Sequence, residues 1–79
     1  MVPAHRRLIA IAEFIKSHPD CTVDDVFTGV ADPGNLTTVY NNLRSLETIQ
    51  AIVKYRDGMG VVRYKRFSHA GQDTDRFYS

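Results

Sequence analysis

The side chains best suited to chemistry stand on a predicted helix that begins at Leu36. Its outward positions carry hydroxyl, phenol, amide and guanidinium groups, at Thr37, Thr38, Tyr40, Asn41 and Arg44. A surface helix usually carries Glu and Lys in pairs four residues apart, which support it. Here Glu47 is the only acid up to Thr48, and the polar groups are those that hydrogen-bond base edges and phosphates. The pattern therefore indicates a helix that reads nucleic acid.

A second group of candidate residues follows this helix and is basic: Lys54, Arg56, Arg63 and Lys65. They lie in or beside two segments rich in β-branched and aromatic residues, 51–55 and 61–67, which a glycine-containing stretch separates. We expect a β-hairpin whose cations contact phosphates. Residues 36–67 carry six cations against two acids, a net charge of +4, whereas the whole chain is +1. A solvated basic face gives the same skew, so charge alone leaves both interpretations open.

Three helices are predicted from apolar residues at helical spacing, over 4–17, 23–30 and 36–48. Pro19 and the Asp32-Pro33-Gly34 stretch end the first two. Thr22 with Asp25 resembles a capping box, and Asn35 stands where the N-cap of the third helix belongs. The third helix should pack on the other two through one apolar stripe: Leu36, Val39, Leu43, Leu46 and Ile49.

Three helices followed by a two-stranded β-hairpin form an α+β fold, the winged helix-turn-helix. At 79 residues the chain has room for one domain. We expect the winged-helix domain to span residues 1–67 and a polar, aperiodic tail to span residues 68–79.

The string Thr37-Thr38-Val39-Tyr40-Asn41-Asn42-Leu43 resembles the DNA-binding domain of the ferric uptake regulator family, and within it the peroxide-sensing branch. The resemblance covers about residues 6–67 and includes Thr22-Val23-Asp24-Asp25-Val26-Phe27. It implies that Tyr40 reaches thymines and that the polar positions after it touch phosphate. The family's dimerisation domain, with its metal sites, is expected to be absent, and Gln50-Ala51 stands where relatives have Gly.

Other chemistries find little support in the sequence. The single cysteine, Cys21, excludes a disulfide within the chain and favours a reducing, cytoplasmic location. We expect it to be a small packed residue and not a reactive thiol. Asp24 and Asp25 are adjacent and point about 100 degrees apart on a helix, so they cannot act as an acid and base pair. We predict no catalysis, no metal site, no cofactor and no membrane span.

Two functions from different classes remain. The first is a sequence-specific transcription regulator that binds double-stranded DNA, with the third helix in the major groove and the hairpin on phosphates. Because specific sites usually comprise two half-sites, a homodimer or a protein partner is expected. The second is a winged-helix interaction module that binds a regulator or polymerase instead of DNA. The low net charge and the acidic second helix favour it, whereas Tyr40, Asn41 and Arg44 favour DNA.

Overall fold

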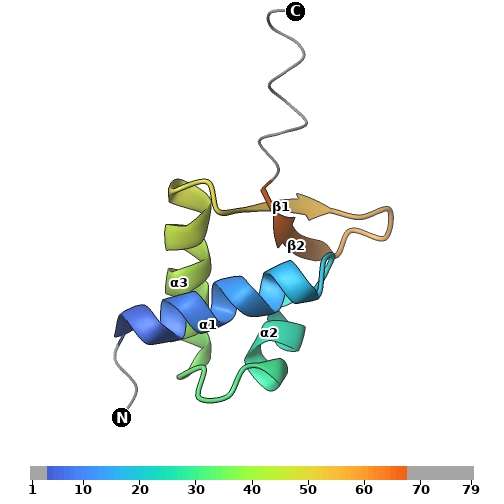
Figure 1. Cartoon of the computed structure of the whole chain (residues 1–79). Helices are drawn as coiled ribbons and strands as arrows, with labels where there is room; N and C mark the ends of the chain where they lie inside the picture. The colour runs from blue at the N-terminus through green and yellow to red at the C-terminus, as the bar shows by residue number, and fades with distance from the viewer. Residues whose placement is uncertain (1–3, 68–79) are drawn as a thin grey trace, which may run out of the picture.

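The computed structural model describes residues 4–67, which form three helices followed by a two-stranded antiparallel sheet (Figure 1). The elements are α1 (Ala4–Ser17), α2 (Val23–Gly29), α3 (Leu36–Thr48), β1 (Ile52–Arg56) and β2 (Val62–Arg66). The predicted elements are confirmed, with α2 one residue shorter than expected because Val30 is already extended. The tail predicted for residues 68–79 lies outside the described residues. Within the described part, no helix is long and apolar enough to cross a membrane.

Both predicted helix caps are present. The Thr22 hydroxyl accepts from the backbone N–H of Asp25 at 3.2 Å, and the Asp25 carboxylate accepts from the backbone N–H of Thr22 at 3.0 Å. At α3 the Asn35 side chain accepts from the backbone N–H of Thr38 at 2.8 Å and from its hydroxyl at 2.9 Å. These bonds satisfy N–H groups that a helix start leaves without partners. The cap at Asn35 therefore sets the direction in which α3 begins, through residues close to it in the sequence.

The core lies where the three helices meet the inner face of the hairpin. Ile11, Ile15 and Val26 are fully buried against the middle of the α3 stripe, whose buried members are Val39, Leu43 and Leu46. The ends of the predicted stripe are wrong, since Leu36 is 44% exposed and Ile49 is 66% exposed. Leu36 is the first residue of α3, and Ile49 is its C-cap, where the backbone leaves helical geometry. Burial therefore reaches only the central turns of the helix.

A contact that the sequence did not predict ties the hairpin to the helices. Cys21, just before α2, pairs with Tyr64 of β2 as an isolated antiparallel bridge. The backbone N–H of Tyr64 donates to the Cys21 carbonyl at 2.8 Å, and the backbone N–H of Asp20 donates to the Tyr64 carbonyl at 2.8 Å. Cys21 is buried, which confirms the expected packed residue, and this burial raises the pKa of its thiol.

The end of α3 forms a Schellman motif around a residue that is not glycine. The backbone N–H of Ala51 donates to the Leu46 carbonyl at 2.9 Å, and that of Gln50 donates to the Glu47 carbonyl at 3.0 Å. Gln50 has φ +62, a left-handed conformation that costs an L-residue free energy and costs glycine little. A strained non-glycine residue therefore completes the turn that ends α3.

The first prediction concerns this strain. Gln50→Gly should raise the free energy of unfolding by about 0.5–1 kcal/mol, since relief of the left-handed conformation outweighs the added entropy of the unfolded chain. In a domain of this size that corresponds to a rise in Tm of roughly 3–6 °C, measured by thermal unfolding. Gln50→Ala keeps the β-carbon and serves as the control, with no gain expected. Equal gains from both substitutions would contradict the explanation.

Candidate nucleic-acid interface

The outer face of α3 carries a row of exposed polar side chains. Thr37, Asn41 and Arg44 are spaced by four and three residues, so they follow one line along the helix, and all three are exposed. Within residues 4–67 the Arg44 guanidinium has no hydrogen-bond or ion-pair partner. An exposed guanidinium beside an amide and a hydroxyl can hydrogen-bond base edges or phosphates without first breaking a contact of the protein.

Thr38 and Tyr40, which the sequence placed on the same face, lie on opposite flanks of this row. Thr38 is half-buried, and its hydroxyl already donates to the side chain of the N-cap residue Asn35. Tyr40 is 48% exposed and lines a pocket on the side of the hairpin. The predicted reading residues are therefore not equivalent, because Thr38 has a structural bond whereas Tyr40 remains available.

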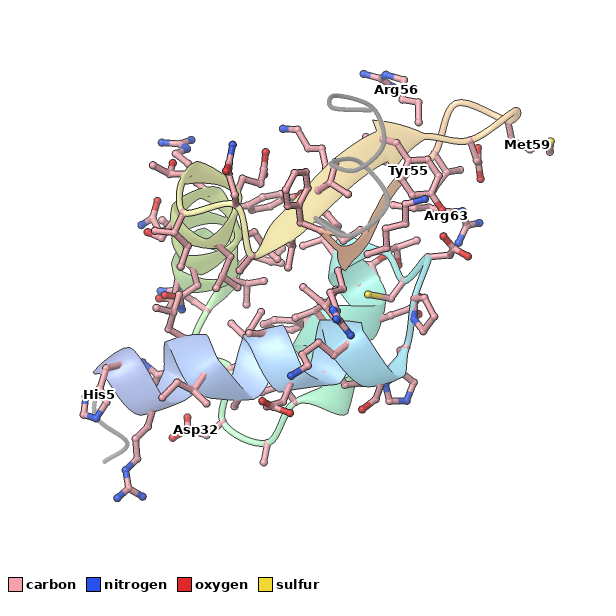
Figure 2. The ribbon with its side chains drawn as sticks, turned by 45° about the horizontal axis from the view of Figure 1, so that its top comes forward. His5, Asp32, Tyr55, Arg56, Met59 and Arg63 are labelled. Carbon is pink, nitrogen blue, oxygen red and sulfur yellow. The ribbon has the colours of Figure 1, made fainter. Side chains whose placement is uncertain are left out.

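Strand alternation divides the four hairpin cations between two faces. In the register of the sheet, Lys54 pairs with Tyr64 and Arg56 with Val62, so these residues share the face that meets α3. Tyr55 pairs with Arg63 and Val53 with Lys65, on the opposite face. Figure 2 shows Arg56 on one side of the hairpin and Tyr55 with Arg63 on the other. A ligand that lies along α3 would therefore meet Lys54 and Arg56, and not Arg63 and Lys65.

Three predicted contact residues come together around one pocket between α2, α3 and the hairpin. The pocket has a volume of about 290 Å³ and is lined in part by Tyr40 and Arg44 of α3 and Lys54 of β1. The Lys54 ammonium lies 4.0 Å from the carboxylate of Glu47. Sequence reasoning identified the cations and the tyrosine, but it missed Glu47 and Tyr64, which line the same pocket. The signal that could have identified Tyr64 is its alternation with Arg63 along β2, because neighbouring residues of a strand point to opposite faces of the sheet.

Arg63 has a structural role that the sequence did not reveal. Its Nε donates to the Asp57 carboxylate at 2.7 Å, and its Nη1 donates to the Asp20 carbonyl at 2.9 Å. Asp57 in turn accepts from the backbone N–H groups of Met59 and Val61, at 2.8 and 2.9 Å. The guanidinium therefore joins the hairpin turn to the loop before α2, and a phosphate would have to compete for it.

Two other cations of the hairpin, Arg56 and Lys65, also have contacts within it. The Arg56 guanidinium donates to the Gly60 carbonyl at 3.0 Å, and the Lys65 ammonium lies 5.1 Å from the centre of the Tyr55 ring. Both side chains remain exposed, so phosphate contacts by either stay predictions. Among residues 4–67 no group of three or more His, Cys, Asp or Glu side chains is arranged to hold a metal ion.

The second prediction follows from the pKa of Asp57. The hydrogen bond from Arg63, followed by those from the Val61 and Met59 backbones, lowers this pKa to about 2. Because the value in the unfolded chain is about 3.9, the stabilisation is fully present above about pH 4 and is lost as the pH falls toward 2. Asp57→Asn should therefore lose less stability over this range than the unsubstituted chain, as measured by urea unfolding at each pH.

Asp25 contributes to the same acid range, because its capping bonds also lower its pKa, and it is unchanged in the Asp57 variant. The difference between the two proteins therefore isolates Asp57. Parallel loss of stability in both would show that the Asp57–Arg63 pair does not hold the hairpin turn.

No family model matches the chain, and no curated protein matches it. Membership of the ferric uptake regulator family is therefore not supported, although the Thr-Thr-Val-Tyr-Asn-Asn-Leu string remains a local resemblance. Among solved structures, the chain is similar to the crystal structure of the apo Zalpha of zebrafish PKZ. The match has a TM-score of 0.71 and 18% sequence identity, and it covers 82% of this chain and 97% of that chain. At this identity the likeness concerns the fold: three helices and a two-stranded hairpin in this order form a winged helix.

Proposed function

We propose that this chain is a winged-helix domain that binds double-stranded DNA, with the outer face of α3 in the major groove. The observation that carries the proposal is the exposed row formed by Thr37, Asn41 and Arg44. The guanidinium of Arg44 has no partner within the described residues. The major groove is wide enough to admit an α-helix. Arginine pairs with guanine and asparagine with adenine through two hydrogen bonds each, so these side chains suit base edges.

Lys54 extends this surface from α3 onto the hairpin. It is exposed and shares the face of the sheet that meets α3, whereas Arg63 lies on the other face and is held by Asp57 and Asp20. We therefore assign a phosphate contact to Lys54 and leave Arg63 out of the contact set. A lysine binds phosphate as a point charge, which gives affinity without sequence preference.

We further propose that the domain serves as a sequence-specific transcription regulator and not as an enzyme. A single winged helix inserts one helix into one groove, and specific sites usually need two such insertions one helical turn apart. A second copy of the chain or a protein partner would supply the other.

The third prediction concerns base reading by Arg44. Arg44→Ala should weaken binding to the preferred duplex by about 1–3 kcal/mol and leave binding to a scrambled duplex nearly unchanged, because base contacts are lost. The preferred duplex would be selected from a random library, and both affinities would be measured by fluorescence anisotropy. Arg6→Ala removes an exposed arginine of α1 and serves as the control. Equal loss on both duplexes would show that Arg44 contacts only phosphate.

The fourth prediction separates the phosphate contact from base reading. Lys54→Ala should weaken all duplexes alike and lower the slope of log affinity against log salt by about one. Lys16→Ala removes an exposed lysine of α1 and should leave the slope unchanged. If the unsubstituted chain binds no duplex at any salt concentration, the DNA-binding proposal fails and the interaction-module alternative takes its place.

A further inference from the structure

The pocket between α3 and the hairpin has an apolar lining and a polar rim. Val23, Leu43 and Val62 form its apolar part. Its volume of about 290 Å³ lies just below the range of small-molecule sites, roughly 300–1,000 Å³. A pocket of this size and polarity suits one flat heterocyclic ring system better than a larger ligand.

Tyr64 brings a buried hydroxyl to this pocket. The residue is 4% exposed, and within residues 4–67 its hydroxyl has no hydrogen-bond partner. Buried polar side chains are nearly always paired, and an unpaired hydroxyl costs free energy. Glu47 and Tyr40 line the same pocket as Tyr64. Burial raises the pKa of Tyr64, and the neighbouring Glu47 and Tyr40 add to this rise. Both backbone groups of Tyr64 are bonded to the loop before α2, so its ring is held in place.

Glu47 supplies a carboxylate on the same pocket. Its side chain is 29% exposed, and the Lys54 ammonium at 4.0 Å is beyond hydrogen-bond distance. Both carboxylate oxygens can therefore accept from a ligand. Two parallel N–H groups match a carboxylate best, as in its pairing with arginine. The pocket thus presents a two-oxygen acceptor and a separate hydroxyl donor.

We propose that this pocket binds guanine, with the attached phosphate held by Lys54, the residue already assigned a phosphate contact. Guanine is the DNA base that presents two adjacent N–H donors, at N1 and N2, beside a carbonyl acceptor at O6. The Glu47 carboxylate accepts from both donors, and the Tyr64 hydroxyl donates to O6. The Tyr40 ring and the apolar lining contact the flat faces of the base.

Two sources can supply this group: a guanine turned out of a bound duplex, or a free guanine nucleotide. The first rests on the proposed function, since the pocket adjoins the α3 surface assigned to DNA. Turning a base out of the stack costs free energy, and this cost is smallest where the base is unpaired. A duplex with an unpaired guanine therefore separates the two sources.

The experiment titrates the whole chain with GMP, IMP and AMP and follows backbone amide NMR shifts. GMP should bind at least tenfold more tightly than AMP, with IMP between them because it lacks the N2 amino group. Shifts should concentrate on α3 and the hairpin. Equal affinities for GMP and AMP, or shifts confined to α1, would overturn the proposal.

Tyr64→Phe tests the hydroxyl without removing the ring. GMP binding should weaken about fivefold to tenfold, whereas Tm should stay the same or rise, because no residue among 4–67 pairs with the hydroxyl. Tyr55→Phe is the matched control: it removes a tyrosine hydroxyl from the same hairpin, one that bonds to Asp20 outside the pocket. Its GMP affinity should not change. Unchanged GMP binding by Tyr64→Phe would overturn the assignment of this pocket.

The second arm uses two duplexes that differ in one guanine, either paired or opposite an abasic position. Tighter binding to the unpaired guanine, abolished by Tyr64→Phe, identifies a base turned out of DNA as the occupant. GMP binding without this preference identifies the free nucleotide. If neither GMP nor the unpaired guanine is preferred, the guanine proposal fails, while binding of the fully paired duplex tests the DNA-binding function independently.

Discussion

The position of the hairpin depends on its short antiparallel contact with the loop before α2. Two backbone hydrogen bonds of 2.8 Å join Tyr64 to Asp20 and Cys21, and the Arg63 guanidinium adds a bond to the Asp20 carbonyl. The Tyr55 hydroxyl bonds to the Asp20 carboxylate from the neighbouring strand. A two-stranded hairpin alone is marginally stable in water, so these contacts and the buried rings give it a fixed place. The pocket beside α3 exists because this place is fixed.

The register of the hairpin decides which cations face α3. A shift of one residue would exchange the two faces, so that Arg63 would point toward the helix and Lys54 away from it. The burial of Ile52 and Tyr64 on the inner face prevents such a shift, because the exchange would expose both side chains. Packing of the core therefore determines the charge pattern of the surface, and composition alone could not reveal it.

The elements could be predicted from the sequence because their signals are local. The caps at Thr22 and Asn35 act over three residues, and the apolar spacing of α3 acts over four. The Cys21–Tyr64 bridge and the bond from Arg63 to Asp20 join residues more than forty positions apart, and no local pattern marks them. The division of the hairpin cations between two faces also depends on such distant contacts. The sequence therefore predicted the residues of the site on α3 and the hairpin, but not which cations face α3.

Four local irregularities of this small domain differ in whether the fold explains them. Asp20 and Asp32 have positive φ, at 71 and 60. The bonds of Asp20 to β2 offset this cost, and Asp32 is held by two hydrogen bonds from Arg7. Gln50 has φ +62 and completes the bonds that end α3. The buried hydroxyl of Tyr64 has no such compensation among the described residues.

The positive φ angles are compensated by hydrogen bonds within the fold, whereas the buried Tyr64 hydroxyl is not compensated by any described residue. Domains of this size have little stability to spare, so an uncompensated cost is expected mainly where function requires it. A different backbone conformation at Asp20 or Asp32 would disturb the hydrogen bonds of these residues to Tyr64 and Arg7. Removing the Tyr64 hydroxyl breaks no hydrogen bond within residues 4–67. The Tyr64 hydroxyl, which no described residue pairs, is therefore the irregularity that the proposed guanine site would explain.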